Sequence, residues 1–257
     1  MFFRLELELK KDKDIFLTQN IASLFHGVLM ENISQPYAEE MHISHIRPYS
    51  QFLRFSEERI FWTICAVNDL AYEKIGLPLL ADTFQTVYLK HKDTAFEILS
   101  KQVKKISMDA LMEQTFFAEC SRYASIHFLT PCAFKTQGHY LFYPTVRLMM
   151  QSLSMKFDEA GYDISVYTPE TISDFEQNIS IVQYKLQSRN FHLEGIKIPS
   201  FCGNITIKIN GPQQLVNLVH MLLRFGTYSG IGIKCALGMG AISIDEKGKT
   251  GIGRDRH

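Results

Sequence analysis

FGTYSGIGIKCALGMGA, residues 225–241, is the stretch that decides the fold, because it holds five of the chain's 15 glycines. It follows an apolar helical pattern and precedes a short strand pattern, Ala241–Ile244. Glycine lets the backbone adopt positive φ and lets a second backbone approach closely. Successive amides in such turns can also point into one concavity and hold an anion. This glycine-rich loop therefore indicates either a phosphate-binding site that contains one lysine, Lys234, or a set of tightly packed turns.

Two common nucleotide-binding motifs are excluded by the spacing of the glycine-rich loop. No Gly-Lys-Ser/Thr follows the glycines, as a mononucleotide P-loop requires. The loop also follows a helix and precedes a strand, which reverses the order of the dinucleotide-binding motif. ATP and NAD are therefore poor ligands for it, whereas a backbone phosphate of a nucleic acid remains open.

The composition is that of an ordinary globular protein, with 46% hydrophobic and 21% charged residues. A chain of 257 residues can form one large domain or two small ones. No apolar run is long enough to span a bilayer, and the first residues alternate as a strand does, so we expect a cytoplasmic protein with no membrane partner. The 27 basic and 27 acidic residues cancel, so a nucleic-acid surface would have to be a local patch.

The metal-binding residue types show no ligand spacing. Five cysteines are scattered without a C-x-x-C pair, which argues against both a zinc site and a disulfide framework. The carboxylates are dispersed, which weakens a two-metal nuclease. We therefore expect neither a metal nor another cofactor.

The first half of the chain has the order strand, helix, strand, strand, helix, strand, which is the ferredoxin-like βαββαβ arrangement. We expect it to form a domain of residues 1–92, with a junction near His91–Thr94. Its six segments are Phe2–Lys10, Ile15–Ile33, Tyr49–Ser56, Ile60–Val67, Asn68–Gly76 and Thr83–Lys90.

The second half repeats this character with longer insertions, so we expect an α+β protein of two tandem ferredoxin-like domains, the second spanning residues 93–246 and ending with the glycine-rich loop. Residues 247–257 are basic and glycine-rich, and we expect a flexible tail. The expected strands are Ala95–Ile106, Arg122–Leu129, Tyr140–Tyr143, Ile179–His192 and Ile205–Ile209, and the expected helices are Met108–Ala118, Pro144–Ala160, Pro169–Gln177 and Pro212–Phe225.

Four segments carry a resemblance to a known family. FHGVLMENI with PYAEEMHISHIRPYSQFLRF, then IHFLTPCAFK, FYPTVRLMMQSL and SGIGIKCALGMGAI, resemble the CRISPR repeat-RNA-processing endoribonucleases of the RAMP superfamily. The resemblance implies tandem ferredoxin-like domains and cleavage of the repeat in the precursor transcript to give guide RNAs, without a metal. It also implies attack by a 2′-hydroxyl that leaves a 2′,3′-cyclic phosphate, a glycine-rich loop that holds RNA, and a histidine after the first helix as general acid or base.

Residues 34–49, the histidine segment, supply the group types that this chemistry requires. One group takes the 2′ proton, one protonates the leaving 5′ oxygen, and a cation faces the phosphorane. His42 matches the position of the family's histidine and is our candidate general acid, with His45 as its rival. Some relatives have a tyrosine in the first helix and a lysine after the histidine, whereas this chain has neither, so Tyr37 and Arg47 are the candidate substitutes. A surface histidine in a polar loop is the alternative for His42.

RNA binding requires cations along a groove, and several fall in or beside the resembling segments of the second half. Each could equally be ordinary surface charge. Our candidate RNA-binding residues are Gly230, Gly232, Lys234, Gly238, Gly240, Lys135, Arg147, Lys156 and Arg224.

Two other functions remain open from the sequence. The same fold could hold repeat or guide RNA without cutting it, as one subunit among others of a CRISPR effector complex. A small-molecule phosphate enzyme that uses the glycine-rich loop ranks last, because no partner motif for magnesium or a nucleobase accompanies the loop. The sequence leaves monomer or homodimer open.

Overall fold

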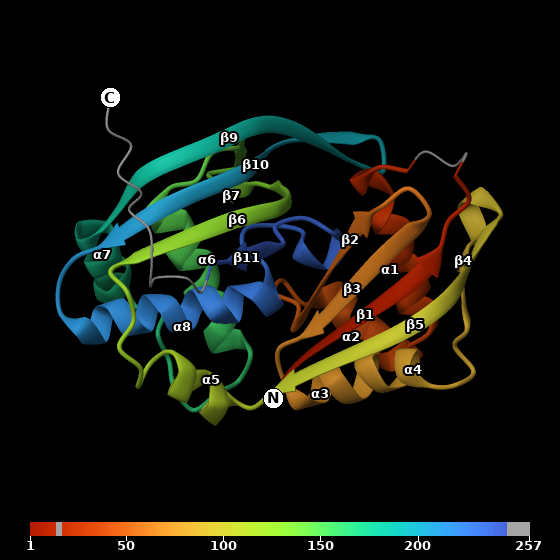
Figure 1. The fold of residues 1–257 in the computed structure, drawn as a ribbon, viewed down its shortest axis with the longest axis horizontal. Helices are drawn as coiled ribbons and strands as arrows, with labels where there is room; N and C mark the ends of the chain where they lie inside the picture. The colour runs from red at the N-terminus through yellow and green to blue at the C-terminus, as the bar shows by residue number, and fades with distance from the viewer. Residues whose placement is uncertain (14–16, 246–257) are drawn as a thin grey trace.

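In the computed structural model, which describes residues 1–13 and 17–245, two antiparallel sheets stand side by side and helices pack against them (Figure 1). The first two residues of the expected helix Ile15–Ile33 and the expected tail, residues 247–257, lie outside this description. Each sheet has the strand order of a ferredoxin-like domain, so the predicted fold class is confirmed.

The first sheet has the order β2-β3-β1-β5-β4. Its central strand β1 buries Leu5, Leu7 and Leu9 on one face, as its alternating sequence predicts. The strands are β1 (Phe2–Lys10), β2 (Tyr49–Phe55), β3 (Arg59–Ala66), β4 (Thr86–Leu89) and β5 (Thr94–Ile106).

The predicted junction near His91–Thr94 places β5 in the wrong half. β5 pairs antiparallel with β1 from Phe2↔Ile106 onward, and β4 pairs only with β5 at the edge of the sheet. The strand that completes the first ferredoxin-like unit is therefore β5, and Thr83–Lys90 contributes an additional edge strand. The short turn η3 (Lys90–Lys92) joins β4 to β5 as a hairpin. We propose that the junction lies at residue 107, between β5 and α5 (Met108–Gln114).

The helices of the first half differ from prediction in their ends. The expected single helix Ile15–Ile33 is a short turn, η1 (Gln19–Ile21), followed by α1 (Ala22–Glu31). The polar stretch after it forms a second helix, α2 (Gln35–Ile43). The next helix does not end at Gly76: it continues through Leu80, and Pro78 lies in the first turn of its last segment. Its parts are α3 (Asp69–Ala71), η2 (Tyr72–Gly76) and α4 (Leu77–Leu80).

The second sheet has the order β11-β6-β10-β9. The expected strand Ile205–Ile209 begins earlier, at Ile196, because the chain turns at Glu194 and Gly195, which both have positive φ. Pro199 fits within β10 because, among the strands that the structure describes, β10 pairs at this position with β9 alone. The strands are β6 (Tyr123–Cys132), β9 (Ile179–Leu193), β10 (Ile196–Ile209) and β11 (Ile242–Ile244), and the helices are α6 (Val146–Glu159), α7 (Pro169–Asn178) and α8 (Gln213–Ser229).

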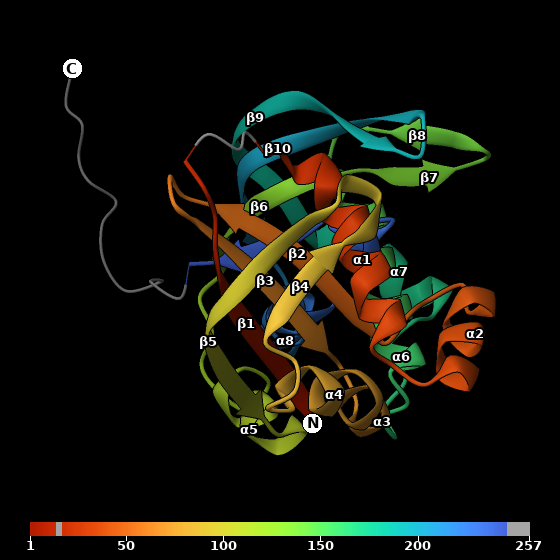
Figure 2. The ribbon, with the colours of Figure 1, turned by 90° about the vertical axis from the view of Figure 1, so that its right-hand side faces the viewer.

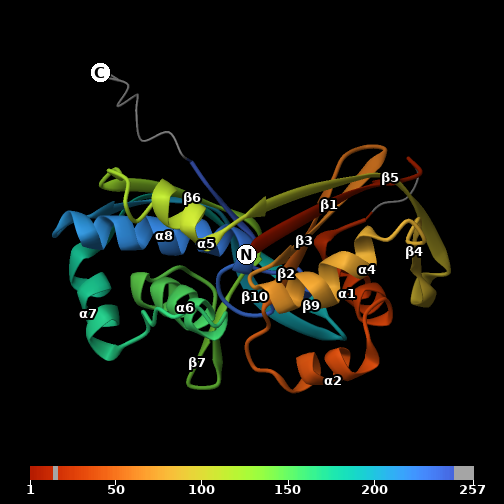
Figure 3. The same ribbon diagram turned by 90° about the horizontal axis from the view of Figure 1, so that it is seen from below.

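A separate hairpin joins β7 (Phe134–Thr136) to β8 (His139–Leu141). Of the expected strand Tyr140–Tyr143, Tyr140 and Leu141 lie in β8, which pairs with β7 across a turn where Gly138 has positive φ. The hairpin and α2 extend on the same side of the two sheets (Figures 2 and 3). This side carries the site described below.

The two halves share a packed interface. Phe2 and Cys65 of the first sheet are buried in the core of the second half, and Ala236 is buried in the core of the first. Hydrogen bonds cross the interface from Arg4 Nη2 to the carbonyl of Thr227 (2.6 Å) and from Tyr162 Oη to the carbonyl of Val67 (2.6 Å). No helix among the described residues is both long and apolar enough to cross a membrane.

Candidate active site between the two halves

The histidine segment runs from α2 into a turn that leads to β2. Pro36 lies in the first turn of α2, and the last turn carries His42. His42 and His45 are exposed, and neither imidazole has a hydrogen-bond partner among the described residues. Arg47 is half-buried, and its Nε donates to the carbonyl of Met41 at 2.9 Å, which fixes the turn against the helix. The ring nitrogens of both imidazoles are therefore available to a bound molecule.

In the structure the glycine-rich loop comprises residues 230–241. Its glycines allow close packing. A Cβ on Gly240 would collide with the carbonyl oxygen of Ile231, and one on Gly238 would collide with the Cβ of Ala22 in α1. Both glycines also have positive φ, of 67° and 103°. The loop therefore packs closely between the two halves, and η4 (Cys235–Leu237) lies against β2.

The backbone amides of the four candidate glycines in this loop are hydrogen-bonded within the protein, so they are not available to a phosphate. Gly232 N donates to Ser152 Oγ (2.9 Å), and the amides of Gly230, Gly238 and Gly240 donate to backbone carbonyls. The prediction that these four glycines hold RNA through their amides is therefore wrong. Close packing, the other reading of the sequence, explains the glycines.

Lys156 on α6 supports the loop from the other side. Its ammonium donates to the carbonyls of Gly230 and Gly232, each at 3.0 Å, and lies 3.0 Å from Cys235 Sγ. An ammonium has three donors, so this one is saturated by the protein. The expectation that Lys156 binds a phosphate is therefore corrected: its ammonium holds the loop in place.

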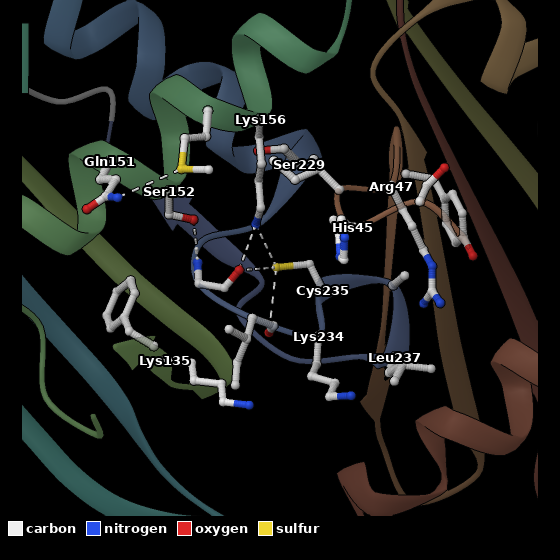
Figure 4. A pocket seen from close by; sticks show the side chains of 18 of the residues that line it. His45, Arg47, Lys135, Gln151, Ser152, Lys156, Ser229, Lys234, Cys235 and Leu237 are labelled. Atoms are coloured by element: carbon white, nitrogen blue, oxygen red, sulfur yellow. Dashed lines mark hydrogen bonds between the residues drawn. The ribbon is translucent and has the colours of Figure 1, made fainter. Parts of the chain in front are cut away.

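Residues distant in the sequence line one cavity of about 720 Å³ between the halves. His42, His45 and Arg47 lie on one wall, and the glycine-rich loop supplies Gly232 and Lys234. Figure 4 shows Lys156 and Cys235 between His45 and Arg47 on one side and Gln151 on the other. Lys135 from β7 and Lys234 are exposed at this cavity. The histidine segment and the loop thus meet across a basic space.

Six candidate residues do not line this cavity: Gly230, Gly238 and Gly240 of the loop, and three residues outside it whose side chains have other surroundings. Tyr37 is buried, its hydroxyl has no hydrogen-bond partner among the described residues, and burial followed by the charge of Glu40 raises its pKa to about 12. Arg147 forms an exposed ion pair with Glu176 (2.6 Å). Arg224 lies in a separate depression. The structure therefore does not bring these three side chains to the histidines.

A buried pair behind the cavity wall was not predicted. His26 Nε2 lies 2.9 Å from Tyr49 Oη, and Tyr49 also lines the cavity. Burial, with the charges of Arg47 and His42, lowers the pKa of His26 to about 4, so its imidazole is neutral at neutral pH. Burial raises the pKa of Tyr49, so its hydroxyl stays protonated. The apolar neighbours of His26 along α1 were the signal for a buried histidine, but they named no partner.

Helix α6 supplies four further residues that the sequence did not single out, Leu148, Gln151, Ser152 and Met155. Their spacing places them on adjacent parts of one helix face, but such a pattern is the same for a core and for a cavity wall. Among residues 1–13 and 17–245, no group of three or more His, Cys, Asp or Glu side chains is arranged to hold a metal ion.

The chain is similar to known proteins over most of its length. Residues 126–242 match the family model of the CRISPR-associated endoribonuclease Cas6. The Streptococcus thermophilus protein of that name is 31% identical over 235 residues, 89% of this chain and 93% of the relative. The Mycobacterium tuberculosis protein of that name is 31% identical over 220 residues, 85% of this chain and 70% of the relative. A solved Cas6 product complex shares the fold with a TM-score of 0.79 at 20% identity, covering 95% of this chain and 100% of that one.

Proposed function

The chain belongs to the Cas6 family of CRISPR-associated endoribonucleases, and from that premise we propose that it cuts the repeat RNA of CRISPR transcripts in the cavity between its two halves. The observation that carries this proposal is the meeting of the histidine segment and the glycine-rich loop in one basic cavity. Repeat RNA is the partner we propose, and the cytoplasm is the proposed compartment.

We assign the chemistry to the two exposed imidazoles. In this mechanism the 2′-oxygen attacks the adjoining phosphorus, the P–O5′ bond breaks, and a 2′,3′-cyclic phosphate and a 5′-hydroxyl result. His42 protonates the leaving 5′-oxygen, and His45 takes the 2′ proton. These two protons account for the reaction without a metal, because no external nucleophile has to be activated.

Arg47 suits the scissile phosphate. Its Nε is used by Met41, which leaves both terminal amino groups of the guanidinium without a partner among the described residues. Two parallel N–H donors match two phosphate oxygens. Since Arg47 lies between the histidines and β2, we place the cleaved phosphate at this wall.

Lys135 and Lys234 face the cavity as exposed cations, and we assign them to phosphates next to the cleaved one. Each phosphate contact lowers the logarithm of affinity by about 0.7 to 0.9 for each tenfold rise in salt. Arg147 and Arg224 are not part of this proposed path.

The test is cleavage of the repeat RNA from the same genome in the presence of EDTA. We expect one cut that leaves a 2′,3′-cyclic phosphate, and no cut when the 2′-hydroxyl at that position is replaced by hydrogen. Cleavage of the 2′-deoxy RNA, or a requirement for a divalent metal, would contradict the mechanism. Tight binding without any product would instead show a repeat-binding subunit that does not cut.

A further inference from the structure

The cavity has a second end, away from the histidines. Leu148, Gln151 and Met155 line it from one face of α6, since residues three and four apart are neighbours on a helix. Tyr140 lines the same cavity from strand β8, beside Lys135. Figure 4 places Gln151 across the glycine-rich loop from the labelled residues of the histidine segment. The proton-transfer groups therefore leave this end unused.

The side chains at this end differ in chemistry from a phosphate site. Leu148 and Met155 offer apolar surface, and Tyr140 offers a half-buried ring that has Lys135 Nζ 6.0 Å from its centroid. An aliphatic wall and an aromatic ring are the usual partners of an unpaired RNA base, and a basic group nearby suits its phosphate.

Gln151 is the polar group at this end. Its Nε2 donates to Tyr167 Oη at 3.3 Å and to Met155 Sδ at 3.9 Å, both long contacts. Its amide oxygen accepts no hydrogen bond from the described residues. An amide NH2 has two donors, so a bound molecule that displaces one of these long contacts finds one donor beside the open acceptor, and this is the pattern with which glutamine reads a base edge.

Resting on the proposed function, we propose that this end of the cavity holds the unpaired base of a nucleotide beside the cleaved phosphate, stacked on Tyr140 and read by the amide of Gln151. The cavity volume of about 720 Å³ lies within the range of ligand pockets, so a base and its adjoining phosphate can occupy it together. Gln151 is thus a specificity-determining residue for the RNA.

The experiment compares four repeat RNAs that differ only in the base on the 5′ side of the cut, and a second set that differs on the 3′ side. We expect the wild-type rate to favour one base by roughly 5- to 150-fold at one of the two positions, which corresponds to one two-bond base contact. The Gln151→Ala variant should cut all four RNAs equally, at the slow rate at which the wild type cuts an RNA with a disfavoured base. Equal wild-type rates on both sets, or a preference that survives Gln151→Ala, would overturn the proposal.

Two variants separate base reading from a structural effect. Gln151→Glu has the same shape but offers only acceptors, so we expect its preference to move toward cytosine, whose amino group is a donor. Gln177→Ala removes an exposed glutamine of α7 whose amide donates to Ser173 Oγ, and it should keep the wild-type preference. An unchanged preference in Gln151→Glu would overturn the proposal.

Binding of 2′-deoxy versions of the same RNAs separates this proposal from the proposed function. If no RNA is cut but the affinity still depends on the base and loses that dependence in Gln151→Ala, the base site stands and the cleavage assignment fails. If cleavage occurs without base dependence in rate or affinity, the base site fails and the cleavage assignment stands.

Discussion

Replacement of Lys156 by methionine tests the role that the structure gives to this residue. The ammonium donates to two carbonyls of the glycine-rich loop and contacts the sulfur of Cys235. Methionine keeps most of the length of the side chain, so the change removes the donors with little change of packing. If each carbonyl loses about 1–2 kcal/mol, the free energy of unfolding falls by about 2–4 kcal/mol. For a chain of this size the melting temperature should fall by roughly 4 to 16 °C.

Lys135→Met is the matched control, because Lys135 also lines the cavity but is exposed. Its unfolding free energy should change by less than about 0.5 kcal/mol. Its RNA affinity should fall, and the slope of log affinity against log salt should become shallower by about one unit. Urea unfolding and RNA titration at several salt concentrations measure both effects. If Lys156→Met were as stable as the wild type and lost RNA affinity in the way that Lys135→Met does, the assignment of Lys156 as a loop support would be refuted.

Three further outcomes follow from the same structure. Arg147→Ala should leave RNA affinity within twofold and stability within about 1 kcal/mol, because its ion pair is exposed and outside the cavity; an affinity loss like that of Lys135→Met in the same titration would contradict this. Gly238→Ala should lower the unfolding free energy by about 2–5 kcal/mol through positive φ and overpacking, whereas Gly27→Ala, with open space around its Cβ, should be neutral or slightly stabilising; equal urea curves would count against the packing account. The pKa of His26 is about 4 in the folded state, below its unfolded value of 6.5. Its contribution to the free energy of unfolding is therefore complete above pH 6.5 and is lost as the pH falls toward 4. Between those values the wild type should lose up to about 3 kcal/mol more than His26→Gln in urea unfolding, and parallel pH profiles would show that His26 is not buried as a neutral group.

Much of the fold could be predicted because local patterns decide it. The alternation of Leu5, Leu7 and Leu9 identifies a strand with one buried face, and the order of segments identifies the ferredoxin-like units. Strand pairing is not local. Nothing within Thr94–Ile106 says whether it pairs with β1 or with the second sheet, so the junction was placed one strand too early.

Single residues explain the other errors in the fold. The predicted helix Asn68–Gly76 stops before Pro78, which lies in the first turn of a helical segment. The predicted strand Ile205–Ile209 starts after Pro199, which lies at a position of β10 paired with β9 and, among the described strands, with no other. Both sites tolerate the missing N–H of proline. That tolerance depends on the position of the residue in the three-dimensional structure.

The candidate site also contains residues that could be assigned from the sequence and residues that could not. The histidine segment carries its chemistry in its own residue types, and the structure places His42, His45 and Arg47 at one cavity wall. The glycines and Lys156 could not be assigned from type alone, because an amide or an ammonium serves a phosphate or a neighbouring carbonyl equally well. Only the contacts of Gly232 with Ser152, and of Lys156 with the loop, decide between these uses.

The central claim is that two exposed imidazoles of one turn transfer the protons of RNA cleavage in this cavity. The most direct measurement is the single-turnover cleavage rate of the His42→Ala, His45→Ala double variant in EDTA, with RNA affinity measured alongside. His91→Ala, His192→Ala is the control, since both of its histidines are exposed and neither lines the cavity. We predict a rate at least about a hundredfold below wild type for the first variant, with affinity within a few fold, and a wild-type rate for the second. An undiminished rate in the His42→Ala, His45→Ala variant would contradict the account.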